Sequence, residues 1–372
     1  MAENSKALFE KLQSQKPQVN LARPTVGRMW LVSLCAFMVV IQSSLTDSFS
    51  SFFIALAAVA AAVLVELLIL YPSGRAAQLR DGSAVASALI LTLLLPDRIP
   101  PVYAALGAAF AMAVIKHSFG GLGSNWLNPA AGGWLFIRTA WPGVFNRALE
   151  GSPLSLVAES FSRGANPQSS PMGILKIDSA GLFSQTSSTD SLIRSFLNDT
   201  VFAVTGAELP GGYIDLFAAV HQGIIADRGI LALLAGTIII TASQANRSWI
   251  PAIWLGAYGF LVRLAGALPY GGGWWNGDVL FSFCSGGVLA AAFILAADPA
   301  TGAKSNWGIL AASATGAVLA WLFRYYGAEP YGALFSVILV NALLPAVRVL
   351  ETRFFYEKRE PRAKRDPARR AS

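Results

Sequence analysis

The chain has 372 residues, of which 54% are hydrophobic and only 13% are charged, and its formal net charge is +7. A soluble domain carries roughly 25% charged residues, so this composition excludes a soluble globular protein and indicates an integral membrane protein. The two cysteines and two histidines are too few for an iron–sulfur cluster, a haem chain or a zinc site within this chain alone.

The N-terminal segment, residues 1–28, is polar and basic. No apolar core with a small-residue cleavage site precedes the first apolar run, so the sequence predicts no cleaved signal peptide. The first run, near Arg28 to Leu45, is expected to act as its own membrane anchor.

Ten apolar runs predict an all-α, polytopic membrane protein with about ten transmembrane helices. A full crossing needs about 20 residues. Two runs, 83–96 and 128–141, are shorter and are bounded by prolines, so we expect half-helices or broken helices there. The runs form two transmembrane blocks, residues 29–141 and 229–350, and lie near 29–45, 51–71, 83–96, 100–116, 128–141, 229–243, 249–266, 278–297, 306–324 and 331–350.

The basic residues predict that both chain ends lie in the cytoplasm. Ten spans place the two ends on one side, and cytoplasmic loops carry an excess of Lys and Arg. Each short loop on the predicted inner side carries at least one, as Lys116 and Arg247 illustrate, whereas Arg228 and Arg324 belong to the sparser outer set. The basic tail, residues 351–372, is interpreted as an orientation signal and solvated end, and no nucleic-acid partner is expected.

The stretch from Lys116 to Pro129, KHSFGGLGSNWLNP, interrupts the apolar pattern with glycines and asparagines. Backbone at membrane depth is normally helical, because unpaired N–H and C=O groups in hydrocarbon are costly. Irregular backbone is tolerated there where it is buried in protein or lines a cavity, so the break is a candidate binding site. Asn125 and Asn128 either contact a ligand or cap the next helix.

Residues 142–228 form one long connection, which the predicted topology places outside the cytoplasm. Loops of this length without regular structure are uncommon, and they are usually functional or disordered. A Ser/Thr cluster spans residues 184–191, and a short helix is expected over Leu192–Asn198. Taken alone, the cluster is typical of a flexible loop with a helix N-cap.

Two acidic residues are candidates for an ion pathway. Glu66 lies deep in one apolar run, and Asp298 follows another run at its cytoplasmic end. Acids inside a membrane are costly and tend to mark ion pathways or ion pairs. The alternatives are an interhelical pair or snorkelling for Glu66, and a simple helix stop for Asp298.

Five blocks follow one another in a characteristic order between residues 80 and 350. As an ordered set they resemble the RnfD/NqrB family, which comprises the D-type component of the Rnf electron-transport complex and the B-type component of the sodium-pumping NADH:quinone oxidoreductase. Chain length and the short N-terminus favour the Rnf member. The blocks are Asp81–Pro96, Lys116–Ala130, Leu209–Phe217, Ala297–Thr301 and Glu329–Gly332, the last followed by Asn341 and Pro345.

The resemblance implies a membrane flavoprotein. Family members hold FMN through a phosphoester on a threonine outside the cytoplasm. This threonine is the last residue of a four-residue motif, (Ser/Thr)-(Gly/Ser)-Ala-Thr. The best match is residues 186–189, so Thr189 is the expected FMN acceptor. Ser188 replaces the alanine and Asp190 follows, which leaves loss of the attachment as the competing interpretation. Residues 205–208 match in part but end in Glu208.

The same resemblance implies a second, noncovalent flavin. The riboflavin site of the sodium-pump relative suggests contacts from the glycine-rich break, so Gly120, Gly121, Asn125 and Asn128 are the expected binding residues. No catalytic residue and no metal site are expected in this chain.

The resemblance implies that the chain is a component of an Rnf-type, ion-translocating ferredoxin:NAD+ oxidoreductase in the bacterial inner membrane. Electrons would pass through its FMN, and this transfer would be coupled to the movement of Na+ or H+ across the membrane. The chain has no dinucleotide fingerprint and no cysteine cluster. NAD and ferredoxin are therefore expected on partner subunits of the A, B, C, E and G types, with an FMN transferase as a further partner. Two alternatives stay open: the corresponding component of the quinone-reducing sodium pump, and a channel or transporter without redox chemistry.

Overall fold

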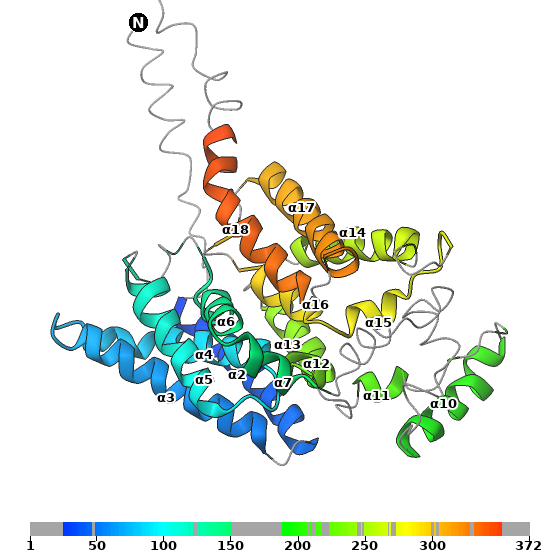
Figure 1. Ribbon diagram of the computed structural model, residues 1–372, viewed down its shortest axis with the longest axis horizontal. Helices are drawn as coiled ribbons and strands as arrows, with labels where there is room; N and C mark the ends of the chain where they lie inside the picture. The colour runs from blue at the N-terminus through cyan, green and yellow to red at the C-terminus, as the bar shows by residue number, and fades with distance from the viewer. Residues whose placement is uncertain are drawn as a thin grey trace, which may run out of the picture.

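The computed structural model is all-α (Figure 1), which confirms the predicted fold class. Within the part of the chain that it describes there are helices, their connections and one isolated antiparallel bridge between Pro96 and Ile224, but no strand. The described residues are 25–46, 49–118, 120–121, 125, 127–150, 188–204, 206, 209, 213–217, 223–243, 247, 249–266, 268, 273–298, 301–302, 305–327 and 331–351.

In its described residues, the first transmembrane block contains five apolar helical segments. Pro101 and Pro129 begin two of them, at the first helical position, where the missing proline N–H costs no helical hydrogen bond. The fourth segment changes from α-helix to π-helix without a break. The segments are α2 (Thr25–Thr46), α3 (Ser50–Leu70), α4 (Ser83–Leu94), α5 (Pro101–Phe110) with η2 (Ala111–His117), and α6 (Pro129–Ala140). A short helix, η1 (Ala76–Asp81), lies between α3 and α4, and α7 (Pro142–Ala148) follows α6.

The described part of the second block also contains five such segments, and the third of them is interrupted. There a one-turn helix is followed by two glycines and then by a second helix that continues as a π-helix. The segments are α13 (Ile230–Ala242), α14 (Trp249–Ala265), α15 (Val279–Phe283) with α16 (Val288–Ala290) and η5 (Ala291–Leu295), α17 (Asn306–Tyr325) and α18 (Gly332–Glu351).

The described parts of the long connection are also helical. They comprise α10 (Ser188–Thr200), η3 (Phe202–Val204), α11 (Tyr213–Phe217) and α12 (Ile225–Arg228). The helix expected over Leu192–Asn198 is therefore present, but it is longer at both ends. The first half of the Ser/Thr cluster, residues 184–187, lies outside the described residues.

Each of the ten predicted apolar runs coincides with helical structure. Among the described residues, three helices are long and apolar enough to cross a membrane: Val26–Leu45, Ser50–Leu70 and Asn306–Tyr325. The two runs expected to be short are short, since α4 and α6 have 12 residues each. The other shorter apolar helices are Pro101–His117, Ile230–Ala242, Trp249–Ala265 and Gly332–Ala346.

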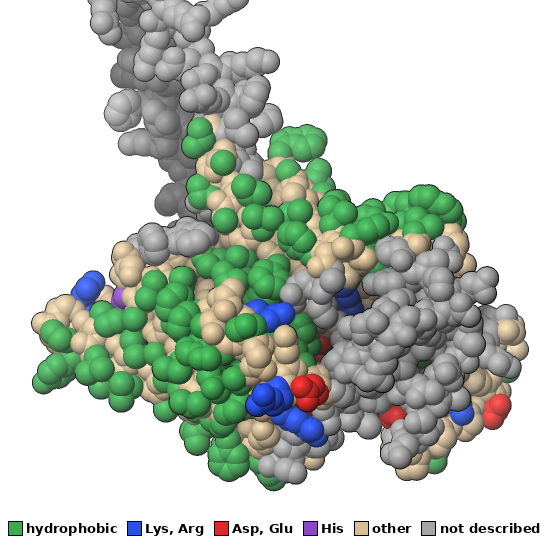
Figure 2. Space-filling view, in the orientation of Figure 1, with side chains coloured by type: hydrophobic (Ala, Val, Ile, Leu, Met, Phe, Trp, Pro, Cys, Tyr) green, Lys and Arg blue, Asp and Glu red, His purple; other side chains and the backbone are tan. Residues whose placement is uncertain are grey.

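The surface of these helices is strongly apolar, as the broad green areas of Figure 2 show. Leu34 is 58% exposed, Leu68 is 63% exposed and Ile238 is 69% exposed. Soluble monomers rarely expose contiguous apolar surface on this scale. This exposed apolar surface agrees with a polytopic membrane protein.

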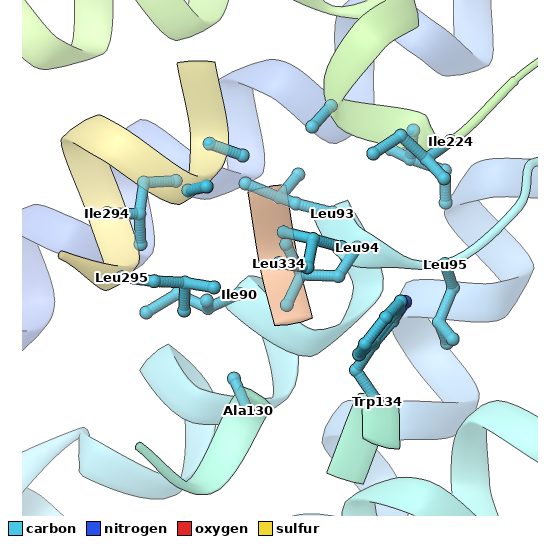
Figure 3. Close-up of a cluster of buried hydrophobic side chains, with 14 of the residues drawn as sticks. Ile90, Leu93, Leu94, Leu95, Ala130, Trp134, Ile224, Ile294, Leu295 and Leu334 are labelled. Atoms are coloured by element: carbon cyan, nitrogen blue, oxygen red, sulfur yellow. The ribbon is translucent and has the colours of Figure 1, made fainter. Parts of the chain in front are cut away.

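The core joins the two blocks at the ends of their short helices (Figure 3). Leu93 and Leu94 of α4, Ile224 beside α12, and Leu295 of η5 are almost completely buried in one cluster with Leu334 of α18. The Ile225 amide donates to the Leu95 carbonyl at 3.0 Å, and the Asp97 amide donates to the Gly223 carbonyl at 3.0 Å. These bonds satisfy backbone groups where both chain segments leave the helical conformation.

Candidate functional site

The glycine-rich break begins at the end of the π-helix η2. Gly120 and Gly121 have φ angles of 100° and 94°, a region that glycine adopts without the penalty other residues meet. The Asn125 side chain is buried. In the amide orientation that satisfies its neighbours, the side-chain nitrogen donates to the carbonyls of Ile115, Lys116 and Gly121 at 3.2–3.3 Å. The break thus ends the helix with side-chain hydrogen bonds.

Asn128 connects this break to the second block. Its side-chain oxygen accepts from the Ala130 amide at 2.9 Å, which caps α6. Its side-chain nitrogen donates to Asp298 Oδ2 at 2.8 Å, and the Thr301 hydroxyl donates to the same oxygen at 3.1 Å. The structure therefore brings together two residues that the sequence placed 170 positions apart.

Glu66 forms an ion pair with Lys116. Both residues are buried, at 2% exposure each. The Lys116 ammonium donates to Glu66 Oε1 and to the Ser83 hydroxyl, the latter at 2.6 Å. Three segments, α3, α4 and η2, each contribute one residue. Of the two alternatives weighed for Glu66, the structure shows the interhelical pair. It also corrects the placement of Lys116, whose charge lies inside the helices instead of in a hydrated loop.

At the interruption between α15 and α16, the end of one helix and the start of the next each contact a buried charged side chain. Gly286 and Gly287 both have positive φ angles, near 70°. The Gly287 amide, at the start of α16, donates to both carboxylate oxygens of Asp227 at 3.0 and 3.2 Å. A carboxylate at a helix start is favoured because the first amides of a helix have no partner within the helix.

Arg324 binds the opposite terminus of the same interruption. Its guanidinium donates to the Ser282 and Ser285 carbonyls at 2.7 and 2.9 Å, to the Ser285 hydroxyl, and to the Tyr258 hydroxyl at 3.1 Å. These carbonyls lie at the end of α15, where intrahelical donors run out. Asp227 and Arg324 therefore satisfy the two ends of one broken helix.

Thr189 lies in the long connection, in the first turn of α10. Its side chain is exposed, whereas the next residue, Asp190, is fully buried and accepts from the Ile214 amide at 3.1 Å. Leu192 and Phe196, which are 70% and 62% exposed, follow at three and seven positions along α10, on the same helix face. The first-turn amides of a helix also favour phosphate nearby.

A chain of hydrogen bonds ties α10 to the interrupted helix. Asn198 exchanges two hydrogen bonds with the backbone of Leu209, at 2.8 and 3.3 Å. The Tyr213 hydroxyl donates to Asp278, whose other oxygen accepts from the Phe281 amide at 3.1 Å and caps α15. Burial, together with this hydrogen bond, raises the pKa of Tyr213 well above its ordinary value. The tyrosine therefore remains a donor.

All the sequence-predicted site residues except Thr189 thus fall into three groups. Gly120, Gly121 and Asn125 surround the end of η2, Asn128 meets Asp298, and Glu66 pairs with Lys116. Thr189 is separate from them on α10. No group of three or more His, Cys, Asp or Glu side chains suited to a metal ion occurs among the described residues.

Sequence reasoning missed two buried arginines. Arg228 and Arg324 were counted among the outer basic residues, but both are buried; Arg228 pairs with Asp97 at 2.7 Å. The signal available was the position of each arginine beside an apolar run and near a glycine or proline interruption. Charge counting alone assigns such a residue to a loop.

These features define a polytopic membrane protein with interrupted helices whose ends are held by buried polar side chains, a construction typical of transport proteins. The chain belongs to the NQR2, RnfD, RnfE family, whose model matches residues 12–355.

Three relatives illustrate the similarity. The D-type component of the proton-translocating ferredoxin:NAD(+) oxidoreductase complex of Clostridium ljungdahlii is 26% identical over 336 residues, covering 90% of this chain and 92% of the relative. The D-type component of the ion-translocating oxidoreductase complex of Shewanella denitrificans is 28% identical, covering 90% and 94%. The corresponding protein of Alcanivorax borkumensis is 32% identical, covering 78% and 80%.

Proposed function

We propose that this chain is a membrane component of an Rnf-type, ion-translocating ferredoxin:NAD+ oxidoreductase in the bacterial inner membrane. The observation that carries the proposal is the family match along nearly the whole chain, together with relatives named as subunits of such complexes. The chain is not expected to catalyse the overall reaction alone. Its partners are the other subunits of the complex and an FMN transferase.

Thr189 is the proposed attachment point for FMN, through a phosphoester formed with loss of one water. The fit rests on three features of α10: an exposed hydroxyl, a first-turn position that favours phosphate, and the exposed apolar side chains of Leu192 and Phe196 on the same face. When bound, FMN supplies one-electron transfer. The protein's part is to hold it on a helix that Tyr213 and Asp278 connect to the interrupted helix.

Gly120, Gly121, Asn125 and Asn128 are the proposed contacts of a second, noncovalent flavin such as riboflavin. Both asparagine side chains already make hydrogen bonds within the protein. The contribution to flavin binding proposed for them is therefore a second role beside helix capping.

Glu66 and Asp298 are the proposed acids of the Na+ or H+ pathway. Both are carboxylates bound by donors from other segments of the transmembrane blocks. Intramembrane acids with such partners are typical of ion pathways.

The test of the flavin proposal compares the wild-type chain with a Thr189→Ala variant, both expressed with the transferase and separated in a denaturing gel. The proposal predicts fluorescence of a flavin bound to the wild-type band and none in the variant. A Thr205→Ala variant is the matched control, because the partial motif at 205–208 lacks an acceptor at its last position. Fluorescence that persists in Thr189→Ala contradicts the assignment.

A second candidate function is that of the corresponding component of the quinone-reducing sodium pump, which the matched family also includes. Quinone-dependent oxidation of NADH by the native complex favours this candidate, and ferredoxin-dependent reduction of NAD+ favours the Rnf type. Absence of any flavin signal in reduced-minus-oxidised spectra favours a transporter without redox chemistry.

A further inference from the structure

The buried pair of Glu66 and Lys116 has an unusual feature: one carboxylate oxygen has no donor. Among the described residues, Glu66 Oε1 accepts from the Lys116 ammonium, but nothing donates to the fully buried Oε2. His117 Nε2 lies 3.5 Å from Oε1 and makes no hydrogen bond within the described part of the chain. Buried polar atoms are nearly always satisfied, so an orphaned carboxylate oxygen calls for an explanation.

The groups around the ammonium are oxygens. Lys116 Nζ contacts Glu66 Oε1 and the Ser83 hydroxyl oxygen, and that hydroxyl in turn donates to Asp81 Oδ1 at 2.5 Å. Oxygen atoms are the ligands preferred by hard cations. Since no described residue donates to Oε2, the Glu66 carboxylate and Ser83 together offer three oxygens to a cation.

The backbone around the pair holds these oxygens in place. The Ser83 amide also donates to Asp81 Oδ1, at 2.7 Å. Gly82 before it adopts a positive φ of 74°, and a Cβ there would lie 2.9 Å from the Trp30 ring. Lys116 lies in the π-helix η2, a conformation frequently found at functional sites. Two helices, α3 and α4, thus hold the oxygens, and the long lysine side chain from η2 is the flexible member.

We propose that the Lys116 ammonium is a tethered competitor for an alkali-cation site formed by Glu66 and Ser83. A monovalent cation such as Na+ enters by displacing the ammonium, and the lysine returns when the cation leaves. The Glu66 carboxylate is then never left buried without a positive partner, which would be strongly unfavourable. The inference rests on the proposed ion-translocating function. It adds that Lys116 neutralises the Glu66 carboxylate whenever no cation occupies the site.

The test uses the full-length chain in lipid nanodiscs and measures thermal unfolding in NaCl against choline chloride at equal ionic strength. A cation that binds only the folded state stabilises it in proportion to its site occupancy. In Lys116→Met the competitor is absent, so the NaCl concentration that gives half-maximal stabilisation is expected to fall at least tenfold below the wild-type value. The matched control is the double variant Lys116→Met with Glu66→Gln, in which a side chain of nearly the same size replaces the carboxylate. It is expected to show no sodium-specific stabilisation.

Three results would overturn the proposal. One is an equal response of Lys116→Met to NaCl and choline chloride. Another is the same sodium response in the double variant, which would locate the effect elsewhere. The third is stabilisation of Lys116→Met by acid and not by Na+, which would show that Glu66 takes a proton instead.

A charge-conserving variant covers the case in which Lys116→Met does not fold. Lys116→Arg keeps the positive charge and can bind both carboxylate oxygens at once. An entering Na+ then has to displace a stronger competitor, so half-maximal stabilisation is expected to need at least threefold more NaCl than in wild type. An unchanged requirement would mean that the lysine is only structural. Because none of these readouts involves flavin or electron transfer, failure of the redox proposal leaves the test intact.

Discussion

Replacement of Arg324 by methionine tests whether the interrupted helix depends on its buried cation. The change removes every hydrogen bond from the guanidinium to the Ser282 and Ser285 carbonyls, the Ser285 hydroxyl and the Tyr258 hydroxyl. Methionine retains much of the apolar packing of the arginine stem but donates nothing. The two carbonyls at the end of α15 are then left without this donor.

The magnitude follows from those two carbonyls. Each buried group left unsatisfied costs about 1–3 kcal/mol, which gives roughly 2–6 kcal/mol for both. The guanidinium no longer has to be desolvated in the folded state, and this offsets part of the loss. We therefore expect Arg324→Met to lower the free energy of unfolding by about 2–5 kcal/mol.

The assay is reversible unfolding of the purified chain in mixed micelles with increasing SDS, followed by tryptophan fluorescence. Arg263→Met is the matched control, because Arg263 is exposed and its one described hydrogen bond, to the Gly277 carbonyl, is 3.3 Å long. That variant is expected to stay within about 0.5 kcal/mol of wild type. A loss for Arg324→Met no larger than the control's would refute the role assigned to the arginine.

Two further variants test the proposed binding and pathway residues. Asn125→Leu removes the amide that caps η2, and we expect the native complex of this variant to lose the proposed noncovalent flavin while it keeps the proposed FMN on Thr189. Extraction and chromatography of the flavins checks this, and unchanged flavin content argues against a ligand role for Asn125. Asp298→Asn removes the charge to which Asn128 and Thr301 donate, so we expect ion uptake driven by electron transfer in inverted vesicles to fall at least tenfold while labelling at Thr189 is kept. Full uptake in that variant would exclude Asp298 from the pathway.

The sequence predicted the helices of this protein well because their signal is local. Apolar runs bounded by Pro96, Pro129 and Pro142 anticipated that α4 and α6 would be short. The membrane forces a buried segment to satisfy its backbone within a helix, so composition over a short window is nearly sufficient. The helix at α10 was anticipated, although its ends were placed too far inward.

The contacts between distant segments were less accessible to prediction. Asn128 and Asp298 were each singled out, but nothing local indicates that they would share a hydrogen bond. Lys116 and Arg324 were assigned to loops by a rule that counts charges near span ends. That rule does not register a cation that pairs inside the bundle, which depends on tertiary packing.

The central claim is that this chain carries FMN through Thr189 as part of an ion-translocating redox complex. The most direct measurement is mass spectrometry of the tryptic peptide 177–194 from the native complex, followed by fragmentation. The account predicts a mass increase equal to FMN less one water, localised on Thr189. An unmodified peptide from a complex that transfers electrons and moves ions would contradict it.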